Sequence, residues 1–113
     1  MKRLEVYYKV KDMDQEVKVS VGYELGGWGM LSGEYSRRGY YVYVQPVTRR
    51  NGMESFTLFD GFKMLLKEVK RQSKKAESEA IAKAQTMMRD LAEKMAMEKG
   101  WTLADAEPYV KGV

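Results

Sequence analysis

Cysteine and histidine are both absent from this chain of 113 residues, and proline occurs only twice. Without cysteine there is no disulfide framework, thiolate nucleophile or sulfur metal site. Without histidine the chain lacks the commonest general base and the commonest transition-metal ligand. Catalysis by a Ser/His/Asp or Cys/His set is therefore excluded. We expect a protein that is not an enzyme and that needs no metal and no cofactor.

Long apolar runs are also absent. No run approaches the roughly 20 residues of a membrane span, and the start Met-Lys-Arg-Leu-Glu-Val lacks the apolar core of a signal peptide. We therefore expect no membrane association and a cytoplasmic location. The length suits one domain, residues 1–113, with a single modest core.

Alternation of apolar and polar residues predicts four antiparallel strands in residues 1–59. Residues 4–11 and 17–24 alternate with period two and are joined by a short polar link. Residues 40–47 form the strongest strand pattern in the chain. An Asn-Gly turn at 51–52 then leads to a fourth strand over 53–59.

The spacing of apolar or small residues over 60–100 predicts one long helix, because they recur at steps of three and four and no proline interrupts them. Asp60 suits the N-cap and Gly100 the stop. Residues 101–113 form a C-terminal docking segment, in which Thr102 caps a short helical turn. The predicted fold class is α+β: a four-stranded antiparallel sheet followed by a long C-terminal helix, in the order ββββα.

A helix of this length extends beyond the sheet, which leaves its C-terminal half with an uncovered apolar stripe. Such a stripe needs a partner in water. We expect a homodimer that pairs through it, and the alternative is a break near residues 72–75 that folds the helix back in a monomer. The predicted dimer interface consists of Ala80, Ala84, Met87, Met88, Leu91 and Met95.

Positive charge is concentrated at the start of the predicted helix. Residues 61–75 carry six basic side chains and one acidic side chain. A local patch of this kind suits an anionic partner, although an ordinary solvated helix face looks the same. The predicted basic helix patch is Lys67, Lys70, Arg71, Lys74 and Lys75.

Basic residues also surround aromatic residues on the predicted sheet, on the face opposite its core side. Single-stranded nucleic acid binds such surfaces, because cations follow the phosphates while flat rings stack with bases. Exposed tyrosines without a ligand are the alternative, since tyrosine is common in strands. The candidate nucleic-acid-binding residues are Tyr7, Lys9, Lys18, Arg37, Arg38, Tyr41, Tyr43, Arg49 and Arg50.

The order of four strands and one helix resembles that of the single-stranded-DNA-binding coactivator, whirly and Pur-type proteins. Their passage from last strand to helix is similar to residues 55–65, SFTLFDGFKML. The resemblance is topological and covers about residues 1–70. It implies a small non-enzymatic protein that binds single-stranded DNA or RNA on its sheet.

A second hypothesis belongs to another functional class. The chain resembles the small accessory proteins of phages and mobile elements, some of which, such as anti-CRISPR proteins, inhibit a host nucleic-acid-handling protein. Its working surface is then the glycine-rich loop around Trp28 and Tyr35, or acidic positions such as Glu24, Glu34 and Glu54.

Overall fold

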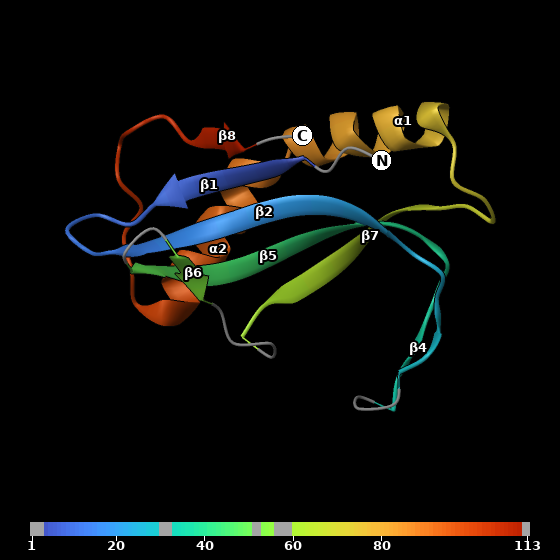
Figure 1. Ribbon diagram of the computed structural model, residues 1–113, viewed down its shortest axis with the longest axis horizontal. Helices are drawn as coiled ribbons and strands as arrows, with labels where there is room; N and C mark the ends of the chain where they lie inside the picture. The colour runs from blue at the N-terminus through green and yellow to red at the C-terminus, as the bar shows by residue number, and fades with distance from the viewer. Residues whose placement is uncertain (1–3, 30–32, 51–52, 56–59, 112–113) are drawn as a thin grey trace.

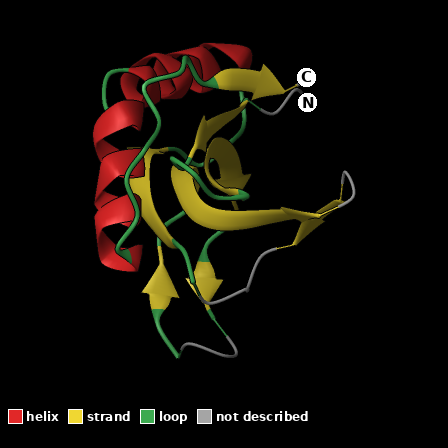
Figure 2. Cartoon of the chain, turned by 90° about the vertical axis from the view of Figure 1, so that its left-hand side faces the viewer, coloured by secondary structure: helices red, strands yellow, loops and turns green. Residues whose placement is uncertain are grey.

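The computed structural model describes residues 4–29, 33–50, 53–55 and 60–111, without the side chains of residues 49, 50, 54, 55 and 111. The described residues form an α+β fold in which two helices cover one face of a curved antiparallel sheet (Figures 1 and 2). In chain order the elements are β1 (Glu5–Lys9), β2 (Gln15–Glu24), β3 (Gly27–Trp28), β4 (Tyr35–Ser36), β5 (Gly39–Arg50), β6 (Met53–Ser55), β7 (Phe62–Glu68), α1 (Lys74–Gln85), α2 (Met88–Lys99) and β8 (Tyr109–Lys111).

The main sheet has the strand order β6-β5-β2-β1-β8, and β7 pairs with β5 on the same side as β6. The antiparallel β2–β5 ladder is the longest, and it runs from Gln15 opposite Thr48 to Glu24 opposite Gly39. The strands predicted over 4–11, 17–24 and 40–47 are confirmed. Of the fourth predicted strand, residues 53–55 are confirmed as β6, and residues 56–59 lie outside the described part of the chain, as does the Asn51-Gly52 turn.

The core lies between the helices and the sheet face that carries the valines. Alternation places every second residue of a strand on that face, and valine packs well on a pleated surface. The two longest strands, β2 and β5, each contribute three side chains to this core. These are Val17, Val19 and Val21 of β2 and Tyr40, Val42 and Val44 of β5.

The long helix predicted over residues 60–100 is wrong in its first part, because residues 62–68 form strand β7. This segment pairs antiparallel with β5 from Gly39 opposite Glu68 to Val44 opposite Phe62. Strand β6 covers β5 only at its far end, so the backbone groups of residues 39–44 need another partner. The predicted passage from strand to helix over residues 55–65 is therefore absent from the described residues, and the ββββα order with it.

The rest of the predicted helix is divided in two. Ser73 caps α1, where its Oγ accepts a hydrogen bond from the amide of Ala76 at 3.0 Å. The helix ends at Gln85, where the amide and the hydroxyl of Thr86 both donate to the Lys83 carbonyl, at 3.2 and 2.6 Å. The predicted stop at Gly100 is confirmed, with a left-handed φ of 73°.

The break brings the predicted dimer stripe back onto the chain's own sheet. Figure 2 shows α1 and α2 running in different directions over one face of it. The reason for a homodimer, an uncovered stripe, is therefore wrong for the described residues, and the homodimer itself stays a prediction. Five of the stripe residues are buried in this core and the sixth, Met87, packs against it; the five are Ala80, Ala84, Met88, Leu91 and Met95.

The helical turn predicted over residues 102–107 is also wrong. Leu103 forms an antiparallel bridge with Val10, and the Lys11 amide donates to the Thr102 carbonyl at 2.8 Å. The chain then adds β8 to the edge of β1, with Tyr109 opposite Tyr7. The C-terminal segment thus docks as predicted, but as a strand.

Candidate nucleic-acid interface

The predicted sheet residues project from the face opposite the helices. Across β1 and β2, Tyr7 lies opposite Lys18, and the period-two alternation of β5 brings its odd-numbered residues to the same side. The members whose side chains are described are Tyr7, Lys9, Lys18, Tyr41 and Tyr43. These five side chains therefore lie on the same face of the sheet, as predicted.

Two of the tyrosine rings on this face are covered. Tyr7 has no exposed surface and stacks on Tyr109, with ring centroids 5.0 Å apart. Tyr41 is buried, its hydroxyl donates to the Arg37 carbonyl at 2.6 Å, and Lys63 Nζ lies 4.9 Å from its ring centroid. Neither ring offers an open face to a base. The prediction that Tyr7 and Tyr41 are stacking platforms is therefore wrong.

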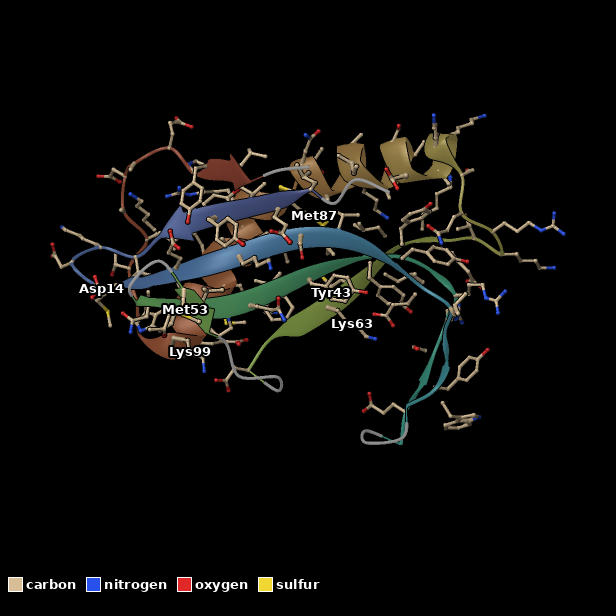
Figure 3. The ribbon with its side chains drawn as sticks, viewed as in Figure 1. Asp14, Tyr43, Met53, Lys63, Met87 and Lys99 are labelled. Carbon is tan, nitrogen blue, oxygen red and sulfur yellow. The ribbon has the colours of Figure 1, made fainter. Side chains whose placement is uncertain are left out.

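Carboxylates pair with two of the cations on the same face, Lys63 and Lys18. Tyr43 and Lys63 lie beside each other on β5 and β7 (Figure 3). The Tyr43 hydroxyl donates to Glu24 at 2.5 Å, and Lys63 Nζ lies 2.8 Å from the same carboxylate. Lys18 pairs with Glu5 at 3.4 Å. This face therefore attracts a polyanion weakly.

The four predicted arginines do not gather around β5. Arg37 and Arg38 precede its first residue, whereas Arg49 and Arg50 are its last two. A strand of 12 residues is about 36 Å long from end to end. The side chains of Arg49 and Arg50 lie outside the description. Lys9 is exposed, at the end of β1 that lies opposite Glu16.

Arg37 and Arg38 instead meet the segment that follows β7. The Val69 amide donates to the Arg38 carbonyl at 3.2 Å, and Arg38 Nη1 donates to the Lys70 carbonyl at 3.4 Å. Arg37 Nη1 pairs with Glu68 at 3.2 Å. We call the resulting cluster of six cations the basic corner. Its members are Arg37, Arg38, Lys70, Arg71, Lys74 and Lys75.

Much of the charge of the basic corner is open to solvent. The first turn of α1, behind its Ser73 cap, adds the partial positive charge of a helix N-terminus. Four corner side chains are exposed and form no ion pair with any other residue that the structure describes: Lys70, Arg71, Lys74 and Lys75.

Lys67, which the sequence assigned to the same patch, is engaged elsewhere. It pairs with Glu79 of α1, and the hydrogen bond from Lys67 holds the pKa of the Glu79 carboxyl below its ordinary value. Because its charge is matched by this partner, Lys67 adds little to the positive field of the corner.

A small hairpin, which we call the aromatic arm, projects from the same end of the molecule. It consists of β3 and β4, paired antiparallel with Trp28 opposite Tyr35 (Figure 1). The two rings meet edge to face, with centroids 5.6 Å apart and planes 64° apart. Trp28 is 75% exposed and Tyr35 is 64% exposed. Both residues belong to the glycine-rich loop that was predicted as the working surface under the second hypothesis.

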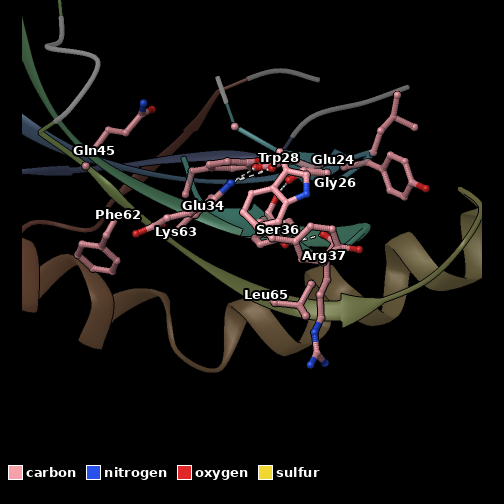
Figure 4. A pocket seen from close by; sticks show the side chains of 18 residues that line it. Glu24, Gly26, Trp28, Glu34, Ser36, Arg37, Gln45, Phe62, Lys63 and Leu65 are labelled. Carbon is pink, nitrogen blue, oxygen red and sulfur yellow. Dashed lines mark hydrogen bonds and ion pairs between the residues drawn. The ribbon is translucent and has the colours of Figure 1, made fainter. Parts of the chain in front are cut away.

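A groove of about 1090 Å³ lies between the aromatic arm and the face of β5 and β7 that is opposite the helices (Figure 4). Aromatic residues line it from both sides, with Trp28 on the arm and Tyr43 on β5. Its charged lining is mixed, because Glu24 and Glu34 contribute carboxylates while Arg37 and Lys63 contribute cations. The groove is large enough for a small ligand or a nucleotide-sized group.

The described part of the chain holds no group of three or more metal-ligating side chains. Neither of the two described helices has the length and apolar character that a membrane span requires. Comparisons with protein-family models, with curated proteins and with solved structures found no match for this chain.

Proposed function

We propose that this protein binds nucleic acid through the basic corner and catalyses no reaction. The observation that supports this most strongly is the meeting of two basic segments, residues 37–38 and 70–75, that lie far apart in the sequence. Four of the six cations are exposed without an ion pair to another described residue. The lack of cysteine and histidine supports the non-enzymatic part of the proposal.

Binding of this kind is driven by release of the counterions that surround the phosphates. For a single strand, the logarithm of the binding constant falls with the logarithm of salt concentration by about 0.7 per phosphate contacted. Four to six contacts therefore give a slope of about −3 to −4, which two salt concentrations suffice to detect.

The test is fluorescence anisotropy of a labelled 20-nucleotide DNA, titrated with protein at low and moderate salt. Lys70→Gln/Arg71→Gln removes two corner charges. We expect the salt slope to become shallower by about 0.7 per charge removed, which corresponds to a 10- to 30-fold loss of affinity near 0.1 M salt. The control is Lys9→Gln/Lys11→Gln, which removes the same charge at the far end of β1. Equal losses for the two variants would contradict the basic corner as the site.

A second candidate function is inhibition of a host nucleic-acid-handling protein, as phage- and mobile-element-encoded inhibitors such as anti-CRISPR proteins do. The observation that favours it is the exposed pair Trp28 and Tyr35, since exposed aromatic residues are frequent anchors of protein interfaces. Glu24 and Glu34 line the adjacent groove. If no oligonucleotide binds even at low salt, this candidate takes precedence.

A further inference from the structure

We propose that the aromatic arm makes the site selective for single strands, with unpaired bases stacking on Trp28 and Tyr35 while the phosphates follow the basic corner. This inference rests on the proposed function, and it names the form of nucleic acid that the site takes. It also moves the stacking role from the sheet tyrosines to a different element.

Exposure separates the arm rings from the sheet rings. Trp28 and Tyr35 are 75% and 64% exposed, whereas Tyr7 and Tyr41 are buried. An edge-to-face pair covers one face of one ring and leaves others open to solvent. Every base has a flat face that can stack on such a ring. In a duplex the bases are already stacked and paired, so the same rings cannot be reached without unpairing.

The arm is joined to the basic corner through Arg38. Its Nε donates to the Leu25 carbonyl at the base of the arm at 2.9 Å, and its Nη1 donates to the Lys70 carbonyl at 3.4 Å. Gly26 lets the two backbone segments at the base of the arm approach closely, because an added Cβ would lie 2.7 Å from the Ser36 carbonyl oxygen and 2.8 Å from the Arg38 amide nitrogen. The base of the arm therefore adjoins the basic corner.

The charges of the side chains indicate where the bases and the phosphates of the ligand bind. Glu34 puts a carboxylate on the arm beside Tyr35, which disfavours phosphates there. The Glu24 carboxylate is already matched by Lys63 and the Tyr43 hydroxyl. The exposed cations lie toward the loop between β7 and α1. Bases are thus expected on the arm and phosphates on the corner, which is how single strands are commonly held.

The decisive experiment compares three probes: oligo-dT of 20 nucleotides, a 20-base-pair duplex, and inorganic polyphosphate, which has charge but no bases. The wild-type protein is expected to prefer oligo-dT to the duplex. Trp28→Leu/Tyr35→Leu should lower the affinity for oligo-dT at least about fivefold per ring lost and leave polyphosphate binding unchanged. Circular dichroism checks that the variant is folded.

Trp28 itself gives an independent readout. In a Trp101→Phe background, oligo-dT should quench the fluorescence of Trp28, and polyphosphate should not, because only bases stack on the indole. Equal quenching by both, or an aromatic variant that binds oligo-dT as the wild type does, overturns the inference. The proposed function then still stands if Lys70→Gln/Arg71→Gln lowers the affinity of the protein for all three probes. Absence of binding by every probe overturns both proposals and favours a protein partner for the arm.

Discussion

Gly39 determines how closely β7 approaches β5. An added Cβ at this position would lie 2.2 Å from the carbonyl oxygen of Lys67 and 2.9 Å from the Cα of Glu68, both backbone atoms of β7. Backbone atoms cannot move aside as a flexible side chain can. The junction that aligns Arg38 with the loop after β7 thus depends on the absence of a side chain at one residue.

We therefore predict that Gly39→Ala lowers the free energy of unfolding by about 3 kcal/mol, because the two strands must separate to accept the methyl group. The measurement is urea denaturation followed by circular dichroism. Gly33→Ala is the control, since Gly33 also has a positive φ but has no atom within 4 Å of an added Cβ. It should lose about 1 kcal/mol. Similar losses for both variants would mean that the collision has no energetic role.

The candidate site was only partly predictable at the level of single residues. Alternation correctly assigned Tyr7, Tyr41 and Tyr43 to the face opposite the core valines. It could not indicate that Tyr109, 102 positions beyond Tyr7, returns to cover the Tyr7 ring. Whether a ring is open depends on what packs over it, and such contacts join residues far apart in the sequence.

At the scale of elements, residues 62–68 illustrate a conflict between local pattern and tertiary pairing. Phe62, Leu66 and Val69 have helical spacing, whereas Phe62, Met64 and Leu66 also alternate as a strand does. A short apolar run fits both periods. The open edge of β5 supplies hydrogen-bond partners to a strand and none to a helix, so the strand forms.

The division of the helices at residues 86–87 leads to a prediction about α2. Met95 is fully buried against the sheet, whereas Met97 is 79% exposed. We expect Met95→Ala to cost about 2–5 kcal/mol of stability and Met95→Lys to prevent folding. Met97→Lys should change stability by less than about 0.5 kcal/mol. Thermal denaturation measures the stability of each variant, and analytical ultracentrifugation measures its oligomeric state.

The predicted dimer would give a different result. If Met95 lay between two copies of α2, Met95→Lys would convert a dimer into a folded monomer. A folded Met95→Lys monomer from a dimeric wild type would therefore contradict the burial of α2 on its own sheet.

At the scale of the whole molecule, the two ends of the chain stabilise each other. Strand β8 completes the sheet beside β1, and Tyr109 stacks on Tyr7. The Tyr109 hydroxyl also donates to Glu16 at 2.9 Å, and Glu16 is a buried carboxylate. The last described strand thus covers a buried charge as well as a ring.

We predict that Tyr109→Ala lowers stability by about 2–4 kcal/mol, the sum of a lost aromatic stack and a lost hydrogen bond to a charged group. Tyr109→Phe should lose only the hydrogen-bond part. Val110→Ala is the matched control, because Val110 on the same strand is 63% exposed. Chemical denaturation of the four proteins measures the differences. If Val110→Ala lowers stability as much as Tyr109→Ala does, β8 stabilises the sheet through backbone pairing alone.

Local sequence patterns were enough to predict the strands of the central sheet, the stop at Gly100 and a basic segment at 67–75, because each depends on neighbours along the chain. Three features could be learned from the folded chain alone: residues 62–68 pair with β5, the apolar stripe packs on its own sheet, and Arg38 joins the base of the arm to the corner. These outcomes depend on contacts between distant segments. Local periodicity carries no information about which distant backbone or ring will satisfy them.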